Sequence, residues 1–140
     1  AEVSESCPVV LPLHPRTGKA LARAGLLDFA TERLRIREPL GYLDMTRLES
    51  SARAIATDSG GVQKEAFFHQ VPCVTIRTET EWVELVEMGW NTICDPRADE
   101  IARHIVEARA PEVIRSNPYG DGTASRTIAR KIMGCVEGDL

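Results

Sequence analysis

The stretch ATDSGGVQKEAFFHQVPCVTIR, from Ala56 to Arg77, constrains the fold more than any other part of the chain. The short apolar run at residues 54–57 predicts a buried strand, and residues 62–69 have the spacing of a helix. The polar tetrad at 58–61 therefore predicts a strand-to-helix turn. The first N–H groups of a helix lack intrahelical partners and carry about half a positive charge, so such a turn favours a bound anion.

Four residues at and after this turn suggest a nucleotide. Gly60 and Gly61 have no side chains to keep a phosphate from the backbone N–H groups, and Ser59 can cap the helix or donate its hydroxyl. Glu65 lies six residues beyond Ser59, about 9 Å along a helix. From there a carboxylate can accept both ribose hydroxyls of a nucleotide whose diphosphate lies at the helix start. The alternatives are ordinary turn chemistry for the tetrad and a solvated helix residue for Glu65.

Strands and helices alternate along the first hundred residues. This alternation predicts βαβ units and a parallel sheet of about five strands, an α/β fold. The expected strands are 8–13, 33–38, 54–57, 73–76 and 91–94, and the expected helices are 19–27, 42–48, 62–69, 82–88 and 99–108. Beyond Pro111 a dense turn segment, 116–122, precedes a final helix over 123–136.

Composition excludes several classes of protein. A hydrophobic content of 43% with 27% charged residues is typical of a globular protein, and 140 residues fit one domain spanning 1–140. No apolar run reaches membrane-spanning length and the first residues lack signal-peptide features, so a cytoplasmic location is expected. A net charge of −4 argues against a nucleic-acid partner. Without a CxxC pair we expect reduced core thiols and no metal site at Cys7, Cys73, Cys94 and Cys135.

Three motifs then identify a family resemblance. TDSGGVQKEA (57–66), RTETEWVE (77–84) and NPYGDG (117–122) closely resemble the non-hydrolysing UDP-N-acetylglucosamine 2-epimerases in order and spacing, as does PLGYLD ahead of the third strand. The resemblance runs from about His14 to the C-terminus. The middle motif is more similar to the branch that includes epimerases of UDP-diacetamido-glucuronate. The resemblance implies a Rossmann-like three-layer sandwich, the C-terminal half of a two-domain glycosyltransferase-B type fold.

The resemblance also implies an activity. Family members are isomerases of cell-envelope polysaccharide biosynthesis that invert C2 of UDP-N-acetylglucosamine by eliminating UDP and adding it back, without a cofactor. Most acidic catalytic residues and the catalytic histidine belong to parts of the family that precede Ala1 here. We therefore expect no catalytic residue in this chain, no turnover by the chain alone, and a missing N-terminal domain as its partner. The full-length enzyme is expected to be a homodimer.

The resemblance assigns roles to residues position by position. Ser59, Gly60 and Gly61 would hold the pyrophosphate and Glu65 the ribose hydroxyls. Met45 stands where relatives place an aromatic residue against the uracil, and a thioether can pack on a ring face.

Three further residues are candidates for the sugar or the cleft. His14 matches a histidine near the interdomain cleft, with a histidine satisfied by its own loop as the alternative. Trp82 and Val83 stand where many relatives have arginine and proline, which leaves Arg77 as the nearest conspicuous cation. Trp82 can form an apolar wall of the sugar pocket or belong to the core.

Two other functions remain open. The donor-binding domain of a UDP-sugar glycosyltransferase would use the same fold and the same UDP geometry, and a non-catalytic nucleotide-sugar-binding remnant would lack catalytic groups. A last helix without a following strand can also reach to another domain, so we expect Ile128, Ile132 and Val136 to be exposed.

Overall fold

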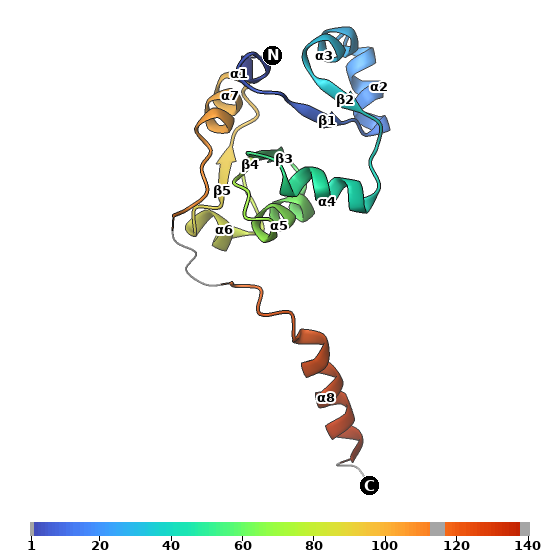
Figure 1. Cartoon of the computed structure of the whole chain (residues 1–140), viewed down its shortest axis with the longest axis vertical. Helices are drawn as coiled ribbons and strands as arrows, with labels where there is room; N and C mark the ends of the chain where they lie inside the picture. The colour runs from blue at the N-terminus through green and yellow to red at the C-terminus, as the bar shows by residue number, and fades with distance from the viewer. Residues whose placement is uncertain (1, 113–116, 138–140) are drawn as a thin grey trace. The chain divides into compact units, whose positions relative to one another are not determined.

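The computed structural model describes residues 2–112 and 117–137, with side chains as far as residue 134 in the last helix (Figure 1). The chain divides into two compact units, Ala1–Ala110 and Pro111–Leu140. Each unit is described by itself. No helix within the described ranges is both long and apolar enough to cross a membrane.

The first unit contains five short strands, and all their pairings are parallel. The parallel α/β fold is thus confirmed, but the strands form two sheets: β1 pairs with β2, and β4 lies between β3 and β5. In the described structure, β1 and β2 pair only with each other, which separates this pair from the larger sheet. The strands are β1 (Val10–Pro12), β2 (Arg35–Arg37), β3 (Ile55–Thr57), β4 (Cys73–Ile76) and β5 (Asn91–Cys94).

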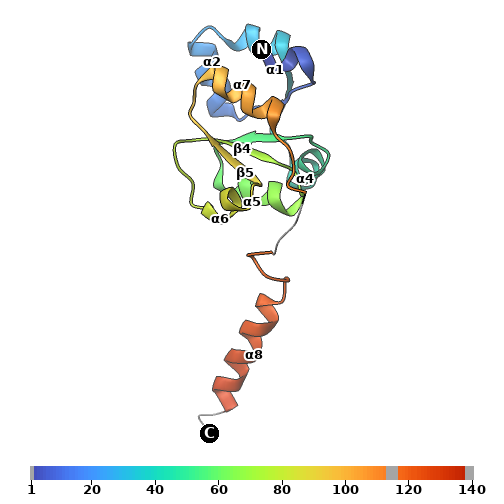
Figure 2. The ribbon, with the colours of Figure 1, turned by 90° about the vertical axis from the view of Figure 1, so that its left-hand side faces the viewer.

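Helices connect and cover these strands. Figures 1 and 2 show α7 on one side of the three-stranded sheet and α5 and α6 on the other, which gives the expected three layers. Helix α4 packs beside α5. The helices of this unit are α1 (Glu2–Ser6), α2 (Pro15–Arg23), α3 (Leu27–Arg33), α4 (Tyr42–Ser50), α5 (Gly60–Phe68), α6 (Val83–Glu87) and α7 (Ala98–Glu107).

The helix expected at 19–27 was placed wrongly. Helix α2 begins at Pro15, because His14 is its N-cap and proline suits a first helical position. It ends at Arg23, shortly before Gly25, whose φ of +67° is the left-handed conformation that follows many helices. The chain then forms α3, a helix that the sequence did not predict.

The core is centred on β4. Cys73, Val74 and Thr75 are buried, and Ala66 of α5 and Leu85 of α6 are fully buried against the sheet region. Cys94 is also buried and Cys7 is half-buried. The thiols of Cys7, Cys73 and Cys94 are free, with no disulfide among them. The side chain of Cys135 lies outside the described residues. Burial raises the pKa of the Cys73 thiol to about 11, so the group is neutral at physiological pH.

The second unit consists of a turn segment and α8 (Ala124–Glu137). Gly120 and Gly122 have φ of +82° and +81°, as a dense turn requires, while Ser116 of the predicted turn lies outside the described residues. On α8, Ile128 and Ile132 are 57% and 61% exposed, as expected. The side chain of Val136 lies outside the described residues.

Candidate nucleotide-binding site

The predicted step from strand to helix is confirmed, but α5 begins at Gly60 and not at Val62, so the two glycines form its first turn. Ser59 is the N-cap of α5, with φ −86° and ψ 124°, and its own N–H donates to Thr57 Oγ1 at 3.0 Å. The first N–H of the helix to find an acceptor is that of Gln63, which donates to Ser59 O at 3.2 Å. The N–H groups of residues 60–62 have no hydrogen-bond acceptor among the described residues. This helix start can therefore bind an anion.

The two glycines have different surroundings. A Cβ on Gly61 would meet only Ser59 Oγ, at 3.8 Å, so this side of the turn is open. A Cβ on Gly60 would collide with the carboxylate of Glu81 and would lie 3.5 Å from the indole Nε1 of Trp82. From the sequence, both glycines were explained in the same way: the lack of a side chain gives a phosphate access to the backbone N–H groups. Gly61 has the open side that this reason requires, whereas Gly60 is also a glycine because a loop packs against it.

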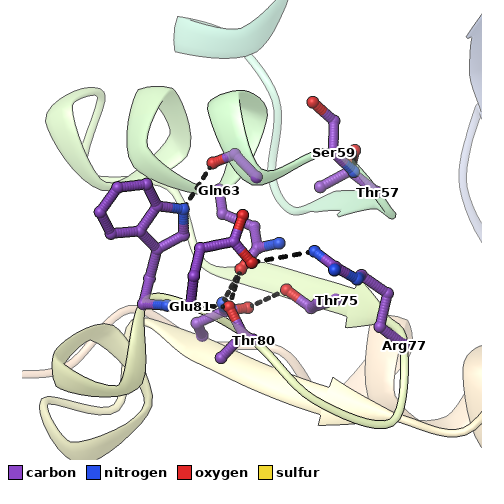
Figure 3. Close-up of polar contacts among 10 residues, drawn as sticks. Thr57, Ser59, Gln63, Thr75, Arg77, Thr80 and Glu81 are labelled. Atoms are coloured by element: carbon purple, nitrogen blue, oxygen red, sulfur yellow. Dashed lines mark hydrogen bonds and ion pairs between the residues drawn. The ribbon is translucent and has the colours of Figure 1, made fainter.

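That loop, residues 77–82, is attached to the start of α5 (Figure 3). The indole N–H of Trp82 donates to Gly60 O at 2.8 Å, and Lys64 Nζ lies 4.4 Å from the centre of the indole ring. Arg77 Nη1 donates to Glu81 Oε2 at 3.0 Å, which places a compensated carboxylate beside the helix start. Arg77 and Trp82 thus lie next to the glycine turn, and Trp82 contacts it through its polar edge.

A buried polar network joins this loop to the sheet, and sequence reasoning missed it. Gln63 Oε1 accepts hydrogen bonds from Thr80 Oγ1 at 2.6 Å and from Asn91 Nδ2 at 2.9 Å. Asn91 Oδ1 in turn accepts from Thr75 Oγ1 at 2.6 Å. Gln63 and Thr75 are fully buried and Asn91 is 3% exposed. The only signal in the sequence was a glutamine inside an otherwise apolar helix face. The network orients the loop relative to the helix start, because each member lies on a different element.

Helices α4 and α5 pack side by side and place Glu65 near two residues that were not predicted, Glu49 and His69, while Met45 lies on α4. Met45 and Glu49 are one turn apart on α4, and Glu65 and His69 are separated by the same interval, with His69 as the C-cap of α5. Glu49 is 3% exposed, and its Oε2 lies 3.6 Å from His69 Nε2. Burial, and after it the negative charge of Glu65, raises the pKa of the Glu49 carboxyl.

His14 is exposed at the start of α2, after β1 of the two-stranded sheet. Its Nδ1 accepts a hydrogen bond from Arg16 N at 3.2 Å, which is the local role held open as the alternative. Its polar contacts within the described part of the chain do not reach the residues around α5, so the cleft role stays a prediction. Among the described residues, no three His, Cys, Asp or Glu side chains are grouped so that they could hold a metal ion.

The fold and the helix start define the class as a Rossmann-like α/β protein with an open helix start whose first N–H groups are unpaired. The family model for UDP-N-acetylglucosamine 2-epimerase matches residues 1–133, and the chain belongs to this family. It is 44% identical over 123 residues to a UDP-2,3-diacetamido-2,3-dideoxy-D-glucuronate 2-epimerase of Pseudomonas aeruginosa, with 87% of the chain and 34% of that protein covered. It is 41% identical over 119 residues to a UDP-N-acetylglucosamine 2-epimerase homolog of Methanococcus maripaludis, with 84% and 33% covered.

Solved structures show the same likeness. The UDP-GlcNAc 2-epimerase of Methanocaldococcus jannaschii, in complex with UDP-GlcNAc and UDP, superposes with a TM-score of 0.83 at 34% identity, covering 94% of this chain and 38% of that one. A putative epimerase from Listeria monocytogenes superposes with a TM-score of 0.71 at 30% identity, covering 98% and 39%. The chain thus spans about a third of the length of the curated relatives it matches.

Proposed function

We propose that this chain is the UDP-sugar-binding domain of an epimerase that interconverts UDP-N-acetylglucosamine, or a related UDP-2-acetamido sugar, and its manno epimer. The observation that carries the proposal is the start of α5, where unpaired N–H groups and the open side of Gly61 precede Glu65 on the same helix. Family membership supports an epimerase over a glycosyltransferase donor domain or a non-catalytic remnant.

In this proposal the chain stabilises the leaving group. When the bond between C1 of the sugar and the diphosphate breaks, negative charge grows on the phosphate, and preorganised N–H donors favour that charge. Ser59 Oγ and the N–H of Gly61 would hold the diphosphate, while Glu65 accepts the ribose hydroxyls and Met45 packs on the uracil. UDP then stays bound until it is added back. The C2 proton transfers belong to the domain that this chain does not contain.

The proposal also covers the cellular location of the protein, the oligomeric state of the full-length enzyme and the sugar of its substrate. Buried free thiols at Cys73 and Cys94 fit a reducing compartment such as the cytoplasm. The full-length enzyme is proposed to be a homodimer with a second, N-terminal domain. The relative from Pseudomonas aeruginosa supports a UDP-diacetamido-glucuronate as a second candidate substrate, because a uronate carboxylate needs a cation and Arg77 lies beside the proposed diphosphate site.

The test combines binding and turnover of the full-length protein. We expect Glu65→Ala to weaken UDP binding by about tenfold or more, because a hydrogen bond to a charged acceptor contributes about 1.5–3 kcal/mol. Ser59→Ala combined with Gly61→Val should abolish binding of the diphosphate. Calorimetry with UDP measures both effects, and unchanged affinity in either variant would contradict the site.

Product analysis decides the reaction. A panel of UDP-2-acetamido sugars, including the diacetamido-glucuronate, is incubated with and without a sugar acceptor. Epimerised UDP-sugar without acceptor is expected. Transfer that requires an acceptor would instead indicate a glycosyltransferase, and binding with neither product would indicate a remnant.

A further inference from the structure

A buried carboxylate lies close to the proposed ribose acceptor. Glu49 is 3% exposed, and its Oε1 has no hydrogen-bond partner within the described part of the chain. Leaving a carboxylate oxygen buried without a partner is unfavourable, and such groups in native proteins usually have a functional reason. Helices α4 and α5 pack side by side, and burial, followed by the negative charge of Glu65, raises the pKa of the Glu49 carboxyl.

The second oxygen of Glu49 has a defined neighbour, the ring of His69. His69 Nε2 lies 3.6 Å from Glu49 Oε2, and the side chains are 22% and 3% exposed. His69 follows Glu65 by four residues along α5, the spacing at which two side chains on one helix face can reach each other. Yet the ring contacts Glu49 on the neighbouring helix, and the carboxylate of Glu65 has no hydrogen bond or ion pair with any described residue.

We propose that Glu49 is a positioning residue for Glu65: by pairing with His69, Glu49 keeps the imidazole away from Glu65 and leaves both Glu65 oxygens available to a ribose diol. The inference rests on the proposed function, since it assumes that Glu65 is the ribose acceptor. It adds a residue from α4 that has no contact of its own with the nucleotide.

The physical reason is competition for one carboxylate. A ribose presents two hydroxyl donors on adjacent carbons, and a carboxylate can accept both only while its oxygens are not engaged elsewhere. The ring of His69 follows Glu65 by one helical turn and can donate its N–H to the same carboxylate, because side chains four residues apart on a helix are neighbours. The carboxylate of Glu49, on the adjacent helix α4, holds the ring of His69 and so keeps it from competing for Glu65.

The experiment measures how strongly the site recognises the ribose hydroxyls. UDP and 2′,3′-dideoxy-UDP are titrated into the full-length protein by calorimetry, and the ratio of the two affinities is the readout. We expect the unmodified protein to prefer UDP by about tenfold or more. In Glu49→Gln, His69 turns to Glu65, and the preference falls by at least about threefold. In Glu49→Gln combined with His69→Gln, the competitor is gone and the preference returns.

Each outcome decides a separate point. If the unmodified protein does not prefer UDP, Glu65 is not the ribose acceptor, and the proposed site and this inference both fail. If the preference exists and survives in Glu49→Gln, only the role of Glu49 is wrong. A general loss of packing would lower the affinity of both ligands and would not be rescued by His69→Gln.

Two further variants keep the test sound. His69→Gln alone should retain the full preference, which remains measurable even if Glu49→Gln does not fold, and a loss of preference there would overturn the inference. Glu87→Gln removes an exposed carboxylate from α6 and is the control for the change in net charge. Thermal denaturation checks that every variant is folded.

Discussion

Gly60 and Gly61 show how two identical neighbours acquire different roles. Both belong to the first turn of α5, yet Glu81 and Trp82 fill the space beside Gly60, while that beside Gly61 is open. A close approach of a loop explains the first glycine in the free protein. The second has no neighbour among the described residues that requires its small size, which agrees with the proposed diphosphate site.

This difference predicts opposite effects on stability and binding. Gly61→Ala places a methyl group 3.8 Å from Ser59 Oγ, an ordinary contact, and alanine is favoured over glycine in a helix by up to about 1 kcal/mol. We expect an unchanged or slightly higher melting temperature and a UDP affinity at least about tenfold lower, because the methyl group occupies the phosphate's approach.

Gly134→Ala is the matched control for this variant. Gly134 lies in α8 with no heavy atom within 4 Å of an added Cβ, so the substitution should affect stability without affecting UDP binding. Thermal denaturation and calorimetry on both variants give the comparison. Equal UDP affinity in Gly61→Ala and the unmodified protein would remove the argument for a diphosphate at this turn.

At the scale of elements, the loop of residues 77–82 controls the charge beside the helix start. It places Glu81 against Gly60, where a carboxylate would repel an incoming diphosphate, and Arg77 compensates it at 3.0 Å. Both side chains are partly exposed, so the pair itself contributes little to stability. The pair matters more for binding, because the positive charge of Arg77 offsets the repulsion between Glu81 and an anion at the helix start.

A double-mutant cycle tests this arrangement. Arg77→Ala should weaken UDP binding because Glu81 is left uncompensated, whereas Arg77→Ala combined with Glu81→Ala should recover a good part of the affinity. We expect the single change to cost about fivefold to tenfold at low ionic strength and less at high salt, since solvent-exposed charges are screened. Calorimetry at two salt concentrations measures both. A double variant as weak as Arg77→Ala would show instead that Arg77 binds the ligand directly.

At the scale of the whole molecule, the chain covers about a third of its relatives, and the proposal gives it the leaving-group site and gives the proton transfers to a further domain. We expect the 140-residue chain to show no epimerase turnover, while the full-length protein converts its UDP-sugar. Separation of the two epimers by chromatography, with the full-length protein as the positive control, measures this. Turnover by the chain alone would place catalytic groups within these residues and overturn the division of roles.

The sequence by itself determined the elements around the site. The Ser59 turn, β3 to β5 and α5 follow from local features, namely apolar periodicity and a glycine pair, and these depend on neighbours a few residues away. The same reasoning failed at 19–33, where the helix start depended on His14 and Pro15 as a cap and the second helix had no strong periodic signal.

Only the tertiary structure decided which side chains meet. Gln63 and Asn91 are 28 positions apart and Thr75 and Asn91 are 16 apart, and the contact between Glu49 and His69 joins two helices. The division of the five strands into two sheets was decided at the same level. Such pairings depend on how helices and strands pack against each other, and a chain read residue by residue contains no local signal for that packing.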